Sequence, residues 1–304
     1  MAVPPQGYGW WYLDALEDGP RRRGLNVIAF IGSVFSPWYR WSGRGDPENH
    51  ACFHVATFGP GGRWSMTDRG RGALRRDEET LRIGASSMRW DGARLHVEVD
   101  ELTWPRLGRL RGTVTVTPRA VTEVELALTP DRGHVWRPFA PSAHVAVDLG
   151  RDGRWEGHGY LDGNFGARPL EADFDRWCWG RFPVPGGARV FYEAELRAGG
   201  ETRLAARFSE DGSVAEEPLP PVAPMRRSLW GVRRETRSDA GQRARQTRGM
   251  LDAPFYTRAA VETTLDGARV EGVHEALDLR RFRQGWLMPM IALRVPRVRG
   301  PRAA

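Results

Sequence analysis

The stretch Leu95-His96-Val97-Glu98-Val99 alternates apolar and polar side chains, which is the period of a half-buried β-strand. Similar short runs recur along the chain, at Leu25 to Ile31, Leu110 to Val116, His144 to Leu149, Val190 to Leu196 and Ala268 to Val273. Glycine turns separate them, among them Asp91-Gly92, Gly199-Gly200 and Asp266-Gly267. Helical periodicity is hard to find, so the sequence predicts an antiparallel all-β protein.

The length of 304 residues suits two domains rather than one. Each half begins near an aromatic strand, Trp10 to Tyr12 and Trp155 to Tyr160, and short strands follow it. Such regularly spaced strands are typical of β-sandwiches or up-and-down barrels. We predict two tandem antiparallel β-barrels, residues 1–150 and residues 151–304. Within the second, the polar stretch Gln242 to Arg248 is predicted to be a loop or a short helix.

The composition excludes several classes of protein. Hydrophobic residues make up 40% of the chain, which is enough for a core and excludes wholesale disorder. The longest apolar run, Leu25 to Phe35, is shorter than the ~20 residues of a membrane-spanning helix, so we expect a soluble cytoplasmic protein. The two cysteines, Cys52 and Cys178, exclude a disulfide framework and a cysteine-based zinc site.

The formal net charge of +7 favours contact with anionic surfaces. All 45 basic residues are arginines, and they are spread along the chain rather than clustered in a tail. Zinc-finger spacing and RNA-binding aromatic signatures are absent, which argues against nucleic acid as a partner. We therefore expect a peripheral contact with an anionic membrane surface.

Aromatic side chains are the most distinctive feature of the composition, with thirteen tryptophans. They either pack the interior of the barrels or line a cavity for a large apolar ligand. Phosphate-binding loops, nucleophile elbows, zinc-binding HExxH motifs and dinucleotide fingerprints are all missing. The sequence therefore predicts no metal and no cofactor, and either chemistry carried out with protons alone or none.

One segment places a carboxyl group among aromatic residues. If His158 to Gly166 is a strand, Tyr160, Asp162 and Asn164 share one face, because the side-chain period is two. Burial beside aromatic rings is expected to raise the pKa of Asp162 and keep it protonated near neutral pH. The alternative is a turn aspartate in an Asp-Gly-Asn loop. Asp252, which comes shortly before Pro254, is more simply interpreted as a turn residue.

Several motifs resemble the acyclic carotenoid 1,2-hydratase family, also called hydroxyneurosporene synthases. The first two are Gly7 to Leu16 (GYGWWYLDAL) and Ile28 to Pro37 (IAFIGSVFSP). The others are Arg63 to Gly70, Gly133 to Pro138, Gly159 to Asn164, Asp252 to Tyr256 and His274 to Leu277. The resemblance covers nearly the whole chain in order. At one point the chain departs from the family pattern: an acidic residue is expected before Asp252, where Leu251 stands, which argues against a carboxyl pair sharing a proton there.

The resemblance implies two lipocalin-like barrels, with the active-site cavity in or between them, and addition of water to the terminal C1–C2 double bond of neurosporene, lycopene or similar acyclic carotenes. No cofactor is implied. Protonation of such an alkene needs a neutral carboxylic acid and aromatic faces that stabilise a cation. We assign Asp162 as the acid, with Tyr160 and Trp136 as support and Asn164 or His158 as partners of water or carboxyl. His134 and Asp252 are further candidates.

Two other functions remain as alternatives. A lipocalin-like barrel can bind a lipophilic molecule without any chemistry, because fold does not fix function. A cyclase could use the same architecture for a different reaction of a cation.

Overall fold

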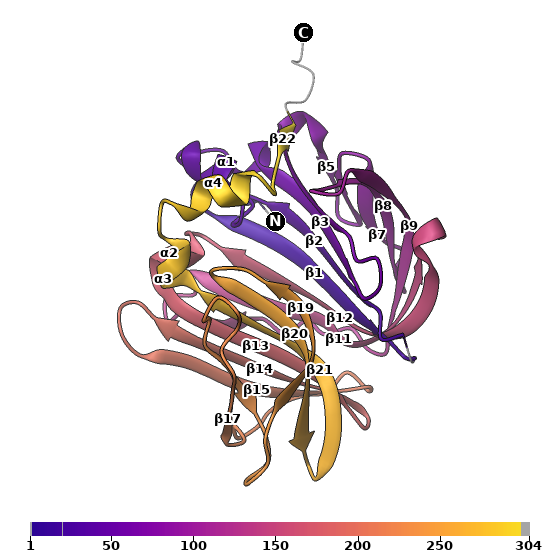
Figure 1. The fold of residues 1–304 in the computed structure, drawn as a ribbon, viewed down its shortest axis with the longest axis vertical. Helices are drawn as coiled ribbons and strands as arrows, with labels where there is room; N and C mark the ends of the chain where they lie inside the picture. Colours follow the sequence, from indigo (N-terminus) through magenta and orange to yellow (C-terminus); the bar gives the residue numbers. More distant parts are fainter. Residues whose placement is uncertain (1, 20, 299–304) are drawn as a thin grey trace. The chain divides into compact units, whose positions relative to one another are not determined.

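The computed structural model describes residues 2–19 and 21–298, and most of its elements are β-strands (Figure 1). The chain forms two compact units. Of the described residues, unit 1 takes 2–19, 21–127, 131–169 and 286–298, and unit 2 takes 128–130 and 170–285.

Unit 1 is built on one thirteen-stranded sheet. Its strands are β1 (Tyr8–Glu17), β2 (Gly24–Ile31), β3 (Ala51–Phe58), β4 (Trp64–Arg69), β5 (Leu74–Arg76), β6 (Thr80–Ile83), β7 (Ser86–Trp90), β8 (Leu95–Thr103), β9 (Gly108–Pro118), β10 (Leu126–Ala127), β11 (His134–Asp148), β12 (Arg154–Gly166) and β22 (Arg297–Val298). The hydrogen-bonded order is β22-β4-β3-β2-β1-β12-β11-β9-β8-β7-β6-β5, and β10 pairs with β11. Short helices complete the unit: α1 (Pro37–Trp41), α4 (Leu287–Ala292), and the 3-10 turns η1 (Pro47–Asn49), η2 (Arg71–Ala73) and η3 (Gly150–Asp152).

The sheet of unit 1 has two faces of different chemistry. One face is apolar: Leu13 of β1, Val27 of β2 and Leu161 of β12 belong to a single large hydrophobic cluster. Because successive side chains of a strand point to opposite faces, Tyr12 and Tyr160 lie on the other face. That second face is also buried, but it consists of aromatic and polar side chains.

Unit 2 contains a seven-stranded sheet in the order β16-β15-β14-β13-β21-β20-β19 and a separate ribbon of β17 and β18. The sheet consists of β13 (Phe174–Val184), β14 (Gly187–Leu196), β15 (Glu201–Ser209), β16 (Val214–Glu216), β19 (Arg245–Asp252), β20 (Tyr256–Leu265) and β21 (Ala268–Asp278). The ribbon is β17 (Val222–Met225) and β18 (Arg234–Arg237), and the helices are α2 (Leu170–Asp173) and α3 (Leu279–Phe282).

The predicted all-β class is confirmed, but closed barrels are not found. In the part of the chain that the structure describes, neither sheet returns to its first strand. The division also differs from a boundary at residue 150, because β12 pairs with β1 and β11 inside unit 1 and β22 returns to pair with β4.

The prediction of a loop or short helix at Gln242 to Arg248 is wrong from Arg245 onward. β19 begins there and pairs with β20. The stretch is polar because β19 is an edge strand, and Arg245 forms an ion pair with Glu262 on its neighbour.

Candidate active site

Two identical tripeptides meet on the polar face of unit 1. Tyr12-Leu13-Asp14 lies on β1, and Tyr160-Leu161-Asp162 lies on the antiparallel neighbour β12. The register sets Tyr12 opposite Asp162 and Asp14 opposite Tyr160. Both leucines point into the hydrophobic cluster, so both tyrosines and both aspartates lie together on the opposite face.

Asp162 accepts two hydrogen bonds at the same oxygen. The indole N–H of Trp136, on β11, donates to Oδ2 of Asp162 at 2.8 Å. The hydroxyl of Tyr160 donates to the same Oδ2 at 2.6 Å. Trp136 also donates to the hydroxyl oxygen of Tyr160 at 3.1 Å. The three side chains therefore form one closed set, which is buried within the sheet.

Tyr160 is held as a neutral hydrogen-bond donor. Burial raises the pKa of its hydroxyl well above the ordinary value of 10, and the neighbouring charge of Asp162 raises it further. Both effects disfavour a tyrosinate, since an ionised phenol would be desolvated and would repel a carboxylate. At neutral pH Tyr160 therefore keeps its proton and donates a hydrogen bond to Asp162.

The other residues predicted on this face lie around that set. Asn164 is buried opposite both Trp10 and Trp136. The hydroxyl of Tyr8 lies 2.8 Å from Nδ1 of His134, and both side chains are buried. Gly166 makes this contact possible, because an added Cβ there would lie 2.2 Å from Cε1 of the Tyr8 ring.

Two candidates have no hydrogen bond to this set among the contacts described. His158 shares the face of Tyr160, but it is half-buried and stands opposite Leu16 and His144. Asp252 belongs to unit 2, where its Oδ2 accepts a hydrogen bond of 2.7 Å from the backbone N–H of Leu229. That contact is the backbone-capping geometry expected of a loop aspartate.

Asp14 and Tyr12 were not among the predicted site residues. The Asp14 side chain is fully buried, and its Oδ2 accepts a hydrogen bond of 2.9 Å from the hydroxyl of Tyr12. The signal in the sequence was the repetition of Tyr-Leu-Asp, which gives a buried carboxyl on each of two strands. Only the pairing of β1 with β12 reveals that the two copies are neighbours.

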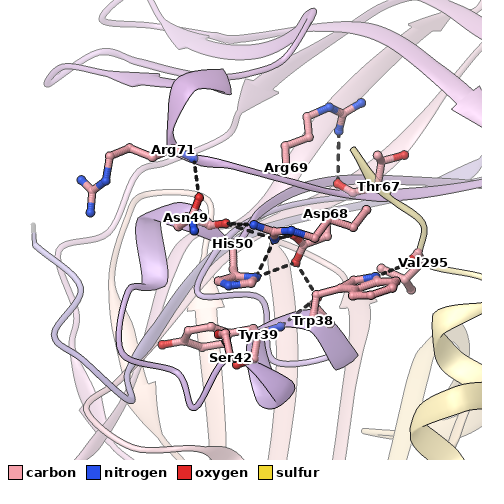
Figure 2. Close-up of polar contacts among 12 residues, drawn as sticks. Trp38, Tyr39, Ser42, Asn49, His50, Thr67, Asp68, Arg69, Arg71 and Val295 are labelled. Atoms are coloured by element: carbon pink, nitrogen blue, oxygen red, sulfur yellow. Dashed lines mark hydrogen bonds and ion pairs between the residues drawn. The ribbon is translucent and has the colours of Figure 1, made fainter. Parts of the chain in front are cut away.

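Asp68, another buried carboxyl of unit 1, has a different environment (Figure 2). Oδ2 of Asp68 accepts from the hydroxyl of Ser36 at 2.5 Å and lies 3.2 Å from Nδ1 of His50. Its other oxygen forms an ion pair with Arg297 of β22. The backbone N–H of Asp68 also donates to the carbonyl of Pro296 at 2.9 Å. This cluster attaches the C-terminal strand to β4.

Neither a metal site nor a membrane-spanning helix is present in the described part of the chain. No group of three or more His, Cys, Asp or Glu side chains there is arranged to hold a metal ion. None of the helices within residues 2–19 and 21–298 has the length and hydropathy needed to cross a bilayer.

Comparison with known proteins gives one consistent family. Residues 27–304 match the model of the carotenoid hydratase CrtC family. The acyclic carotenoid 1,2-hydratase of Cereibacter sphaeroides is 55% identical over 272 residues, which cover 89% of this chain and 98% of that protein. The enzyme of the same name from Rhodobacter capsulatus is 53% identical over 278 residues, 90% of this chain and 98% of its own length.

Solved structures share the fold at low sequence identity. A putative AttH protein from Nitrosomonas europaea superposes with a TM-score of 0.62 at 16% identity, covering 90% of this chain and 92% of its own. Kievitone hydratase from Nectria haematococca gives 0.55 at 12% identity, covering 91% and 90%. These likenesses concern the β-rich architecture alone. The family model and the close relatives show that this chain belongs to the carotenoid hydratase family and is a hydro-lyase, a homologue of the acyclic carotenoid 1,2-hydratases.

Proposed function

We propose that this protein adds water to the terminal C1–C2 double bond of acyclic carotenes such as neurosporene or lycopene, with Asp162 as the proton donor. The observation that carries the proposal is the pair of hydrogen bonds that Trp136 and Tyr160 donate to Oδ2 of Asp162. Because Oδ2 already accepts two hydrogen bonds, the acidic proton of a neutral Asp162 belongs on Oδ1. The donors thereby orient the carboxyl group and fix which oxygen delivers the proton.

The aromatic surroundings suit the cation that this protonation creates. Transfer of the proton to C2 leaves a tertiary cation at C1, which needs stabilisation without capture by a nucleophile. The rings of Tyr12 and Tyr160 meet edge to face at 6.1 Å, and Trp10 stacks on Tyr8 at 4.9 Å. The face of an aromatic ring carries negative potential that attracts a cation, and it has no lone pair that would bond to the cation. A water molecule that reaches C1 then completes the alcohol.

The mass of the product separates this proposal from its alternatives. Purified protein, desalted and treated with EDTA, is incubated with lycopene or neurosporene in detergent. A hydratase gives a 1-hydroxy carotenoid that is heavier by one water. A binding protein returns the carotene unchanged, and a cyclase gives a product of unchanged mass, so either of those results would reject the proposal.

We also propose that unit 1 docks on an anionic membrane, where carotenes dissolve, through α4 and α1. The helices lie side by side, and Trp286, Met290 and Leu293 are 58%, 43% and 71% exposed along α4 and its flanks. Trp41, at the end of α1, is 51% exposed. From Leu279 to Ala304 every charged residue is an arginine. An exposed apolar helix flanked by arginines is the composition of an interfacial membrane anchor.

Leu293→Glu is expected to weaken binding to anionic liposomes by about tenfold or more. The substitution removes an exposed leucine that would insert into the lipid, and it adds a negative charge that the anionic headgroups repel. Leu229→Glu is the matched control, since Leu229 is a 96% exposed leucine of unit 2 and its substitution changes the net charge equally. Liposome co-sedimentation at several salt concentrations measures both. Equal losses of binding in the two variants would mean that net charge alone governs binding. If the wild type bound neutral and anionic liposomes equally well, the proposed role of charge would be contradicted.

A further inference from the structure

Asp14 is a buried carboxyl group to which the reaction proposed above assigns no role. It is fully buried and lies on the same face as Asp162, one strand away. We infer that Asp14 and Asp162 form a pair that shares one proton, in which Asp14 is the base that accepts the proton of the attacking water. The inference rests on the proposed function and adds a second carboxyl to its site.

The geometry makes the two carboxyls diagonal neighbours. Asp14 stands opposite Tyr160, and Asp162 stands opposite Tyr12, two positions along the ladder. Diagonal residues of an antiparallel pair are about 7–8 Å apart at Cα, and their side chains reach closer. Each carboxyl accepts a hydrogen bond from the tyrosine of its own tripeptide, at 2.9 Å for Asp14 and 2.6 Å for Asp162. The arrangement therefore repeats one carboxyl–tyrosine pair on two strands.

The two carboxyl–tyrosine pairs interact electrostatically. The charges of both Asp162 and Asp14 raise the pKa of Tyr160, which stands directly opposite Asp14 in the ladder. The titratable groups that share this face include Tyr8 and Tyr12 of β1, Tyr160, Asp162 and His158 of β12, His134 and His144 of β11 and His54 of β3, while β2 presents Asn26 opposite Asp14.

Ionisation of both buried carboxyls is unfavourable, because the negative charge of one raises the pKa of the other. One of them therefore keeps its proton near neutral pH. This supplies the neutral acid that alkene protonation needs, and it explains how a carboxylic acid persists without relying on burial alone. Asp252 lacks the acidic neighbour that the family pattern predicts, because Leu251 stands there. Asp14 and Asp162, by contrast, lie on adjacent strands.

The proton balance of the reaction closes within the pair. The electron pair of the C1–C2 double bond takes the proton of Asp162 and forms a C–H bond at C2, leaving a cation at C1 and a carboxylate on Asp162. A water oxygen then bonds to C1, and the proton it releases goes to the Asp14 carboxylate. Return of that proton from Asp14 to Asp162 restores the starting state. Only water and the alkene are consumed.

The test compares Asp14→Asn with the wild type by the pH dependence of kcat. We expect turnover to fall by about 10²–10⁴-fold, as for loss of a general base. We also expect the alkaline limb to move to lower pH: without the charge of Asp14, the pKa of Asp162 falls, so the active protonated form is lost sooner as pH rises. A purely structural role would leave the limb in place. Near-normal turnover with an unmoved limb would overturn the inference.

Infrared titration keeps the inference testable if Asp14→Asn does not fold. Wild-type protein at neutral pH is expected to show a protonated carboxyl band that disappears in Asp162→Asn, where Asp14 alone ionises. Absence of any protonated carboxyl in the wild type would overturn the shared proton. These outcomes differ from failure of the proposed function, in which the wild type itself hydrates no carotene.

Discussion

Asp162→Asn is expected to reduce turnover by at least about 10²–10⁴-fold, the usual effect of losing a general acid. The amide keeps a carbonyl oxygen that can accept the hydrogen bonds of Trp136 and Tyr160, so the geometry around Oδ2 is preserved. It lacks the acidic proton that the alkene must receive. Carotene binding and the unfolding temperature are expected to change little, because a neutral carboxylic acid and an amide have similar desolvation requirements.

Asp252→Asn is the matched control, since it makes the same chemical change in unit 2. Its side chain caps the backbone N–H of Leu229, so the substitution is expected to affect stability, if anything, and not the chemical step. Turnover with lycopene in detergent, together with thermal unfolding, measures both variants. Near-normal turnover of a folded Asp162→Asn protein would remove Asp162 from the mechanism, and a selective loss in Asp252→Asn would identify Asp252 as the acid.

Asp68→Ala is expected to lower the thermal unfolding midpoint by roughly 10 °C or more. The substitution removes the carboxylate that Ser36, His50 and Arg297 all contact. Breaking a buried ion pair from one side typically costs about 3–5 kcal/mol, because the remaining charge stays desolvated. It also releases the side chain that attaches β22 to β4.

Glu125→Ala is the control for this substitution. Glu125 pairs with Arg132 at 2.5 Å, but both side chains are well exposed, and such surface pairs contribute little to stability. Calorimetry of the two variants compares a buried and an exposed carboxylate within unit 1. The same small shift for both would mean that Asp68 contributes no more than a surface ion pair.

The strands could be predicted because their signal is local. Alternation over five to ten residues identifies a half-buried strand without knowledge of its partner, as at Leu95 to Val99. The same period predicted that Tyr160, Asp162 and Asn164 share a face, and the structure brings Trp136 to that face through β11. These parts of the candidate site depend on one strand and its direct neighbour in the chain.

The remainder depends on pairings between distant segments. Asp14 could not be assigned to the site because β1 and β12 are separated by most of unit 1, and no local pattern specifies which strands pair or in which register. Arg297 reaches Asp68 across 229 residues for the same reason. The expected closed barrels were not found for a similar reason, since strand periodicity does not determine whether a sheet closes.

Incubation in isotopically labelled water tests the hydration directly. Desalted protein is mixed with lycopene in detergent and EDTA, once in oxygen-18 water and once in heavy water, and the products are analysed by mass spectrometry. If water adds after protonation by a carboxylic acid of the protein, the product formed in oxygen-18 water carries that oxygen in its new hydroxyl group. The product formed in heavy water carries deuterium at C2, because the acid exchanges its proton with the solvent. A hydroxyl oxygen derived from molecular oxygen, or activity that returns only when a metal is added back, would contradict this mechanism.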